Sequence, residues 1–437
     1  MKQAVILAGG KGTRLSSRLN GLPKPLMDFS GNPLLWHQLN LLQENGFLEV
    51  LVLVSHLADK IADYIEQNNC WDMDIRCIEE IEPLGTAGAV LSIYDELDST
   101  FLVVYGDTML DVDLAQFEAF HKNKKECEIT LFVHPNSHPY DSDLIQIDNN
   151  NNVIAIHGYP HNQDLYLRNL VNAALYIINR DCLKQSSWST GDSLDFAKDL
   201  FPQLIELDIP IAAYNSPEYI KDCGTPDRLD TAVSDYRSGK INTSRLDVPQ
   251  KVIFLDRDGT INYDVGHLSN EKDLRLLDGT AEAIKLINDS NYRCIIVTNQ
   301  PVIARGECSF ADLEKLHNII EMGLGAEGAY IDRIYFCPHH PDSGFENERP
   351  DLKIKCECRK PGIGLLKKAN DDFNIDFNRS WFVGDTTVDI MTAKNLGISS
   401  ILVQTGAAGM DGKYVVEADH ETQDLLSAVK LILAKET

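Results

Sequence analysis

An apolar run that ends in two acids constrains the fold of this chain more than any other feature. Residues 251–260 read Lys-Val-Ile-Phe-Leu-Asp-Arg-Asp-Gly-Thr, so Asp256 and Asp258 follow directly after the apolar stretch. Such a stretch is typical of a strand in a parallel sheet that is covered on both faces. Because ligands of such sheets gather beyond the carboxyl ends of the strands, we expect Asp256 to lie at a binding site. A carboxylate there can attack phosphorus, while a second acid protonates the leaving oxygen and later activates water.

Two later apolar runs end in polar residues in the same way. Residues 294–300 end in Thr298-Asn-Gln, and residues 381–389 place Asp385 directly after a Val-Gly pair. Three strand ends of this kind are expected to converge on one crevice. The alternative is that Asp-Arg-Asp-Gly forms an ordinary turn after a strand, and the ordered later strand ends disfavour it.

In this order, the motifs resemble those of the haloacid dehalogenase superfamily of phosphatases. The resemblance implies that Asp256 is the nucleophile, Asp258 the acid/base, Thr298 a donor to the phosphoryl group and Lys360 its cationic clamp. It also implies that Asp385 holds Mg2+ together with Asp256 and the backbone carbonyl at Asp258. A hard cation is physically reasonable here, because a phosphoryl group and a cluster of acids repel each other unless a cation bridges them.

Two short clusters of thiols and imidazoles lie between these motifs. Cys337 is followed by His339 and His340, and Cys356 is followed by Cys358. Three thiols and one imidazole supply the four ligands of a tetrahedral zinc site, which leaves no open position and is therefore structural. The alternative is a set of reduced cytosolic thiols beside a solvated histidine pair. The arrangement resembles that of heptose bisphosphate phosphatases and histidinol phosphatases, which implies that His339, not His340, is the ligand.

The heptose 1,7-bisphosphate phosphatases are the closer match of the two. That resemblance implies that the substrate is contacted by Asn299, Gln300, Arg305 and Arg359. One departure is that Pro301 and Val302 stand where those enzymes usually carry Ser-Gly. The change removes a hydroxyl and a backbone N–H from a loop expected to touch the substrate, so the sugar stereochemistry stays open.

The first half of the chain carries a glycine-rich loop of its own. An apolar strand is expected at residues 4–8, and the loop at residues 9–15 follows it, with Lys24 shortly downstream. Glycines let backbone N–H groups approach phosphate oxygens, and Lys11, Arg14 and Lys24 add positive charge where a triphosphate would lie. The loop matches neither the P-loop nor the dinucleotide-binding fingerprint.

Further segments extend this signature across residues 1–235. Residues 84–88 read Leu-Gly-Thr-Ala-Gly, an apolar strand at residues 101–105 leads into Gly-Asp-Thr, and residues 219–226 read Tyr-Ile-Lys-Asp-Cys-Gly-Thr-Pro. Together with the loop they resemble the sugar-1-phosphate nucleotidyltransferases. In that chemistry a sugar phosphate oxygen attacks the α-phosphorus in line, so catalysis is mostly alignment and charge neutralisation.

The resemblance assigns roles to the charged residues of this half. Lys11 and Arg14 would bind the triphosphate, Lys24 would steady the reacting phosphates, and Asp107 and Asp222 would hold Mg2+. One alternative is that the two acids are solvated turn residues, and another is a regulatory domain without catalysis. The remaining nucleotide-binding positions implied by the resemblance are Gly9, Gly10, Gly12, Thr13, Gly85, Thr86 and Gly88.

The expected sugar-binding strand contains one unusual residue. Asn172 begins the run Asn-Ala-Ala-Leu-Tyr, which matches the family's strand, except that Ala174 replaces the usual glycine. The extra methyl group is expected near the sugar pocket, which leaves the fit of the sugar open.

The chain length agrees with two such enzymes. A chain of 437 residues is longer than one hydrophobic core normally spans. We expect a nucleotidyltransferase domain at residues 1–237, a linker at 238–249 and a phosphatase domain at 250–437. Both are expected to be α/β, the first a Rossmann-like mixed sheet and the second a doubly wound parallel sheet with a zinc-binding loop.

Charge and hydropathy exclude some classes of partner. The net charge of −26 argues against nucleic-acid and anionic-membrane surfaces, because either polyanion would be repelled. No run of eighteen apolar residues is present, and the chain enters a strand soon after Met1, which predicts neither a membrane span nor a secretory signal. Together with scattered cysteines, this predicts a cytoplasmic protein.

The two halves suit consecutive steps of one pathway. We expect the second half to remove the 7-phosphate of a heptose 1,7-bisphosphate, and the first half to join the remaining heptose 1-phosphate to a nucleotide. The resemblance favours GTP and the α-anomer, for a GDP-heptose used in surface polysaccharide. Another base or sugar 1-phosphate, with a histidinol-phosphatase-like second half, stays open, as does the oligomeric state.

Overall fold

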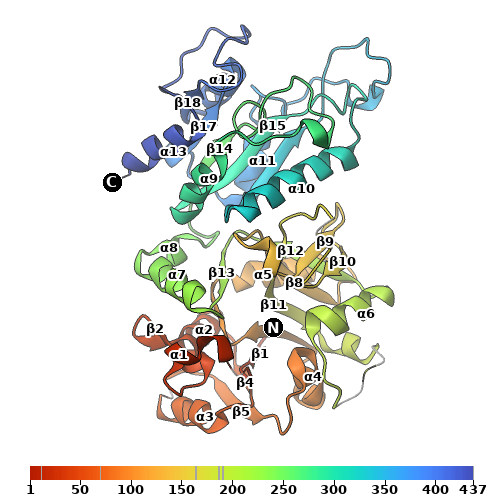
Figure 1. The fold of residues 1–437 in the computed structure, drawn as a ribbon. Coiled ribbons are helices and arrows are strands. Elements are labelled where there is room, and N and C mark those ends of the chain that lie inside the picture. Colours follow the sequence, from red (N-terminus) through yellow and green to blue (C-terminus); the bar gives the residue numbers. More distant parts are fainter. Residues whose placement is uncertain (11, 69, 163–164, 186–187, 189–190, 437) are drawn as a thin grey trace. The chain divides into compact units, whose positions relative to one another are not determined.

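The computed structural model describes the chain except for residues 11, 69, 163–164, 186–187, 189–190 and 437. The chain divides into two compact units (Figure 1). Unit 1 comprises Met1–His134, Ser142–His161 and Leu170–Arg245, and unit 2 comprises Pro135–Asp141, Asn162–Asn169 and Leu246–Thr437.

Unit 1 is built on a nine-stranded mixed sheet. Its main path runs in the order β10-β9-β11-β6-β1-β4-β5, and β8 pairs with both β11 and β12. Strands β1, β4, β5 and β6 are parallel, whereas β11 is antiparallel to β6. The strands are β1 (Gln3–Leu7), β4 (Glu49–Val54), β5 (Asp74–Glu79), β6 (Thr100–Tyr105), β8 (Ile129–His134), β9 (Leu144–Ile147), β10 (Val153–His157), β11 (Val171–Asn179) and β12 (Ile211–Asn215).

Both faces of this sheet are covered, and its central strands β1, β4 and β6 are apolar after their first residue. Val5 of β1 packs in one core with α4, and its neighbours Ala4 and Ile6 pack in the other core with α2 and α3. A separate two-stranded ladder joins β7 (Thr108–Asp111) to β13 (Tyr219–Asp222). The longer helices of unit 1 are α2 (Leu34–Glu44), α3 (Ala58–Gln67), α4 (Gly85–Ser92), α5 (Leu114–Asn123), α6 (Phe201–Glu206) and α7 (Pro226–Arg237).

Unit 2 is built on a six-stranded parallel sheet in the order β16-β15-β14-β17-β18-β19. Alternate residues of β14 face opposite cores: Ile253 and Leu255 pack with α9, α10 and α13, and Val252 and Phe254 pack with α11 and α12. The fold class expected from the sequence is therefore confirmed for both halves. The elements are β14 (Lys251–Leu255), β15 (Tyr292–Asn299), β16 (Arg333–Cys337), β17 (Trp381–Gly384), β18 (Ser399–Val403), β19 (His420–Thr422), α9 (Thr280–Asp289), α10 (Phe310–Ala326), α11 (Gly364–Phe373), α12 (Thr387–Leu396) and α13 (Leu425–Ala434).

Two short segments from the first half of the sequence belong to unit 2 and pack on α10. The hydroxyl of Tyr140 donates to the Met322 carbonyl at 2.9 Å. The backbone N–H of Asn169 donates to Oε2 of Glu321 at 2.8 Å. Unit 2 is thus assembled from three stretches of chain rather than one.

The stretch expected to be a linker is partly folded. Residues 238–249 include the short helix α8 (Lys240–Thr243), and its Ile241 is 1% exposed in a core with Leu229 and Ala232 of α7. Residues 238–245 of this stretch belong to unit 1, and the buried side chain of Ile241 anchors them there. Among the helices of the described residues, none is both long enough and apolar enough to cross a membrane.

Candidate active sites

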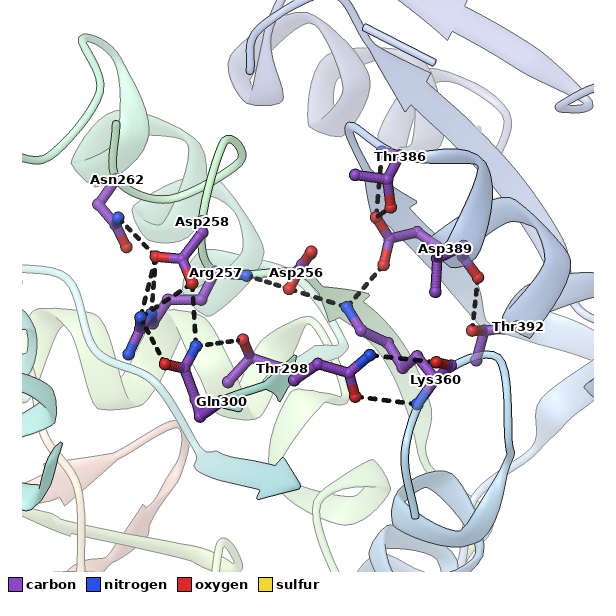
Figure 2. Close-up of polar contacts among 12 residues, drawn as sticks. Asp256, Arg257, Asp258, Asn262, Thr298, Gln300, Lys360, Thr386, Asp389 and Thr392 are labelled. Atoms are coloured by element: carbon purple, nitrogen blue, oxygen red, sulfur yellow. Dashed lines mark hydrogen bonds and ion pairs between the residues drawn. The ribbon is translucent and has the colours of Figure 1, made fainter. Parts of the chain in front are cut away.

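The carboxyl ends of β14 and β15 bring together an acid and a lysine in unit 2. Asp256 directly follows β14 and is 9% exposed. Nζ of Lys360 lies 2.8 Å from Oδ1 of Asp256 and 2.6 Å from Oδ1 of Asp389 (Figure 2). Asn299, at the end of β15, holds the Lys360 backbone by accepting its N–H at 2.9 Å and donating to its carbonyl at 3.1 Å. The buried ammonium group of Lys360 therefore forms ion pairs with two buried carboxylates.

A third acid leaves this cluster with excess negative charge. Asp256, Asp385 and Asp389 each offer a carboxylate oxygen within 4.8 Å of the others. Burial, reinforced by the charge of Asp389, raises the pKa of Asp256 to about 7. Burial and the charge of Asp256 raise the pKa of Asp385 to about 8. Such shifts mark carboxylates whose charge is not compensated.

The carboxylates of this cluster are suited to bind a hard divalent cation. Oδ1 of Asp385 is buried and, among the described residues, has no hydrogen-bond partner. Gly259 has a φ of +80°, and a Cβ there would lie 2.3 Å from Oδ2 of Asp385, so only glycine permits this close approach. Mg2+ prefers carboxylate and carbonyl oxygens. Asp256 and Asp385 fit the ion, which would neutralise negative charge on a bound phosphoryl group.

Asp258 points away from this cluster into a network of hydrogen bonds (Figure 2). The fully buried Arg257 donates to it from Nε at 3.1 Å and from Nη2 at 2.8 and 2.9 Å. Asn262 and Gln300 each donate to it at 2.9 Å. Burial raises the pKa of Asp258, but the charge of Arg257 and these hydrogen bonds outweigh burial and lower it overall. Asp258 is therefore ionised near neutrality, and Arg257 stabilises its charged form.

His317 of α10 lies behind Arg257. Its Nε2 is 3.3 Å from Nη1 of Arg257. Burial and the positive charge of Arg257 lower the pKa of His317 to about 3. The neutral imidazole therefore accepts a hydrogen bond from the guanidinium, which fixes the arginine that holds Asp258.

The two thiol clusters come together in one site. The sulfurs of Cys337, Cys356 and Cys358 lie 3.2 to 3.6 Å apart, and Nδ1 of His339 lies 3.2 Å from the sulfur of Cys358. One potential ligand atom from each of these four residues lies within 4.8 Å of the others, and the three cysteines are not in disulfide bonds. Zinc–sulfur bonds of about 2.3 Å in a tetrahedron separate sulfurs by about 3.8 Å, which these residues nearly match. His340 instead accepts a hydrogen bond from the backbone of Asp342 at 3.1 Å.

The cations expected near the substrate lie beside this site. Nη1 of Arg359 donates to the His339 carbonyl at 3.2 Å. Arg305 lies over the ring of Phe345 at 4.8 Å, and its Nη2 is 3.5 Å from the ring nitrogen Nε2 of His340. A metal that fixed Cys358 would therefore also fix Arg359 and, through the next peptide, Lys360.

Unit 1 contains a cavity of about 400 Å3 at the glycine-rich loop. Arg14, Lys24 and Asp107 line it, and Nζ of Lys24 forms an ion pair with Asp107. The expected residues that line it are Gly9, Gly10, Gly12, Thr13, Arg14, Lys24, Gly85, Thr86 and Asp107. The expected Lys11 lies outside the described residues.

The ladder between β7 and β13 brings the two expected metal-binding acids of unit 1 together. Asp222 pairs with Thr108, and the N–H of Cys223 donates to the Asp107 carbonyl at 2.9 Å. Arg228 lies 2.6 Å from Oδ2 of Asp222. Oδ1 of Asp222 is buried and has no partner among the described residues, so the pair fits a hard cation beside the cavity.

Comparison with known proteins matches each half of the chain to an enzyme family. A family model described as Nucleotidyl transferase matches residues 3–239, and one described as HAD-hydrolase-like matches residues 357–428. The D-glycero-beta-D-manno-heptose-1,7-bisphosphate 7-phosphatase of Haemophilus ducreyi is 38% identical over 161 residues, which is 36% of this chain and 86% of that protein. The D-glycero-D-manno-heptose-1,7-bisphosphate 7-phosphatase of Thermosynechococcus vestitus is 36% identical over 192 residues, which is 42% of this chain and 96% of that protein. The chain belongs to the nucleotidyl transferase and haloacid dehalogenase families.

Among solved structures, HddC from Yersinia pseudotuberculosis is 26% identical and covers 54% of this chain and 100% of its own, with a TM-score of 0.47. That score is low for the whole chain, so the assignment rests on the sequence matches. Both families are enzymes, and the chain therefore combines a nucleotidyltransferase half with a phosphatase half.

Two residues expected to contact ligands, Gly88 and Asn172, make close contacts within the protein. In the transferase, a Cβ at Gly88 would lie 2.4 Å from the Asp192 carbonyl, so this glycine allows close backbone packing. Asn172 donates to the hydroxyl of Tyr176 at 3.0 Å. Gly88 and Asn172 are outside the lining of the cavity as far as the described residues define it.

The alanine noted in the sugar-binding strand has an unusual backbone. Ala174 has a φ of +57°, in the left-handed region that favours glycine. It lies where the pairing of β11 with β8 shifts register between Asn172 and Tyr176. The glycine that related transferases usually carry would suit this bulge without strain.

Sequence reasoning missed three residues of the phosphatase site. Arg257 stands between the two acids, His317 lies on a helix far along the chain, and Asp389 binds Lys360. Only Asp389 had a local signal, because Thr386 and Asp389 form a capping box at the start of α12. Gln300 was expected at the substrate, but its amide contacts Arg257 and Asp258.

Proposed function

We propose that the phosphatase half hydrolyses the 7-phosphate of D-glycero-D-manno-heptose 1,7-bisphosphate. The buried cluster of Asp256, Lys360 and Asp389 is the observation that carries the proposal. Asp256 attacks phosphorus and forms an aspartyl phosphate, and Lys360 offsets the charge of the transferring group. The names of the two phosphatase relatives support the substrate.

Asp258 and Thr298 complete this mechanism. As the aspartyl phosphate forms, the bond from phosphorus to the C7 oxygen of the sugar breaks, and Asp258, protonated for this step, gives its proton to that oxygen. The ionised Asp258 then takes a proton from the water that hydrolyses the aspartyl phosphate, which releases phosphate and restores Asp256. The hydroxyl of Thr298 accepts a hydrogen bond from Gln300 at 2.9 Å, which leaves its own proton for a phosphoryl oxygen. Mg2+ held by Asp256, Asp385 and the carbonyl of Asp258, when bound, supplies further charge neutralisation. Zinc held by the cysteines and His339 is structural.

In the transferase half, the heptose 1-phosphate attacks the α-phosphorus of GTP. Arg14 and Lys24 offset the charge of the triphosphate, and the loop glycines admit its oxygens. Asp107 and Asp222 would hold Mg2+, which would neutralise further charge on the phosphates. The choice of GTP follows the family resemblance of the two halves together. The products are GDP-heptose and pyrophosphate, and a cytoplasmic location suits an enzyme that consumes a nucleoside triphosphate.

A substrate screen tests this function. Full-length protein is incubated with each of four nucleoside triphosphates and several sugar 1-phosphates, and pyrophosphate is measured. In parallel, phosphate release is measured from the heptose bisphosphate and from histidinol phosphate. We expect the combination of GTP and heptose 1-phosphate to release pyrophosphate fastest. Among the phosphatase substrates, we expect the heptose bisphosphate to release phosphate fastest. Lys24→Ala should lower pyrophosphate release by about a hundredfold and leave phosphate release unchanged, because one contact to the reacting phosphates is lost. Preferred hydrolysis of histidinol phosphate would contradict the proposal.

A further inference from the structure

A segment from the first half of the sequence braces helix α10 of the phosphatase. This brace comprises residues 165–169, which belong to unit 2. The side chain of Asn318 donates from Nδ2 to the Tyr166 carbonyl at 3.0 Å. The backbone N–H of Asn169 donates to Oε2 of Glu321 at 2.8 Å. Two backbone groups of the brace are therefore fixed to side chains of α10 that lie about one turn apart.

The brace is held in turn by the other segment of the first half that belongs to unit 2. Nδ2 of Asn169 donates to the Asn136 carbonyl at 2.7 Å, and the N–H of Asn136 donates to Oδ1 of Asn169 at 3.2 Å. Both asparagines are buried. Pro139 packs on α10 at Gly325, where a Cβ would lie 2.4 Å from the proline ring. Reciprocal hydrogen bonds between buried groups fix the backbone of the brace against the helix.

The brace also brings a cation to the buried acid of α10. Glu321 is 6% exposed. Burial raises the pKa of Glu321, and the positive charge of the half-buried Arg168 opposes this rise. Arg168 also acts on His317, whose pKa is lowered first by burial and further by this charge. His317 and Glu321 are four residues apart and share one face of the helix, so Arg168 lies near the face that carries His317.

His317 connects this face of α10 to the acid/base residue. Its Nε2 lies 3.3 Å from Nη1 of Arg257, whose Nη2 donates to Oδ2 of Asp258 at 2.8 Å. A shift of α10 would move His317 and allow Arg257 to draw Asp258 away from the leaving oxygen. Because proton transfer needs hydrogen-bond contact, even a displacement of about 1 Å would slow it.

We propose that the brace, through Arg168 and Glu321, positions Asp258 for proton transfer in the phosphatase. Arg168 is a positioning residue, because it acts through His317 and Arg257. The inference rests on the acid/base role of Asp258 in the proposed function. It makes a segment from the transferase half of the sequence a working part of the phosphatase.

Two phosphate esters with different leaving groups separate positioning from stability. The sugar alkoxide of heptose 1,7-bisphosphate needs a proton as its bond to phosphorus breaks, whereas 4-nitrophenolate is a stable anion and leaves without one. Values of kcat/KM report the steps up to departure of the leaving group, so they exclude the later attack of water. In full-length Arg168→Met, kcat/KM should fall about tenfold for the bisphosphate and stay within about twofold for 4-nitrophenyl phosphate. Arg168→Lys keeps the positive charge and should recover most of the loss.

Lys315→Met is the matched control. Lys315 is a cation of the same helix whose Nζ lies over the Tyr166 ring at 5.3 Å, but its side chain is 47% exposed. This variant should leave both kcat/KM values unchanged. Unchanged pyrophosphate release and a melting temperature above that of the assay show that each variant is folded. If Arg168→Met does not fold, Asn318→Ala removes the bond to the Tyr166 carbonyl and should lower kcat/KM about threefold for the bisphosphate alone.

The outcomes also separate this inference from the proposed substrate. An equal fall for both esters would mean that the brace contributes only stability, and no fall for either would mean that it does not act on the site. Either result would overturn the proposal. If wild-type protein hydrolyses 4-nitrophenyl phosphate but not the bisphosphate, the proposed substrate is wrong, and the same comparison is made with the sugar phosphate that the protein does hydrolyse.

Discussion

Replacing Arg257 with methionine should destabilise the phosphatase half and change the protonation of Asp258. The guanidinium is 0% exposed and pairs with Asp258, whose side chain is 27% exposed. Methionine fills a similar volume but leaves Asp258, Gln300 and His317 without a donor they now use.

The expected cost follows from the burial of the partner. Leaving a buried charge unpaired costs about 3–5 kcal/mol, and partial exposure of Asp258 lets water screen it, so we expect about 3 kcal/mol. For a unit of this size, that lowers the melting temperature by about 6–12 °C. The matched control is Arg379→Met, because Arg379 is 59% exposed and lies 3.9 Å from Glu436. A surface pair of this kind contributes at most about 1 kcal/mol.

The pH dependence gives a second reading of the same change. The pKa of Asp258 is lowered in the folded protein, so the stability it contributes is present above its unfolded pKa of about 3.9 and is lost as the pH falls through its folded pKa. Without Arg257 the folded pKa of Asp258 rises. The cost of Arg257→Met, measured by calorimetric unfolding, should therefore be smaller at pH 5 than at pH 8. A loss under 1 kcal/mol at pH 8, or no dependence on pH, would refute the role given to Arg257.

Three further changes test other parts of the structure. Cys356→Ser should release zinc and lower phosphatase activity while nucleotidyl transfer persists, since four-ligand zinc sites contribute folding energy. The control Cys70→Ser, at an exposed free thiol, should change neither the zinc content nor the phosphatase activity. Elemental analysis that finds no zinc in wild-type protein would remove the basis of this prediction. Ala174→Gly should stabilise the transferase half by about 0.5–1 kcal/mol, because relief of about 1–2 kcal/mol of left-handed backbone strain exceeds the entropic cost of glycine. The control Ala173→Gly should destabilise the transferase half. A lower melting temperature for Ala174→Gly would contradict the backbone seen at this bulge. Residues 250–437 expressed alone should keep phosphatase activity but melt at a lower temperature than the same unit in the full chain, because the hydrogen bonds of Tyr140 and Asn169 to α10 are absent. An equal melting temperature would mean that these contacts contribute nothing to stability.

The parallel strands and their polar ends could be predicted because the signal is local. The apolar run before Asp256 predicts a buried strand, and the order of the motifs indicates that Asp385 lies beside it. The grouping of His339, rather than His340, with the three cysteines also follows from the spacing seen in related phosphatases.

The rest depends on contacts between distant parts of the chain. The sequence places Arg257 between two acids but does not show that its side chain turns inward to Asp258 and reaches His317, sixty residues later. Ile241 looks like an isolated apolar residue in a polar stretch, and only its packing on α7 shows that the stretch is folded.

The order of the two reactions is tested most directly by following phosphate and pyrophosphate in one mixture. Wild-type protein is given heptose 1,7-bisphosphate and GTP. Phosphate should appear first, and pyrophosphate should follow after a lag that added heptose 1-phosphate abolishes. Asp256→Asn keeps the side-chain shape but removes the nucleophile, so the bisphosphate should accumulate while supplied heptose 1-phosphate is still converted. Pyrophosphate without a lag, together with nucleotide-sugar made from the bisphosphate by Asp256→Asn, would contradict the account.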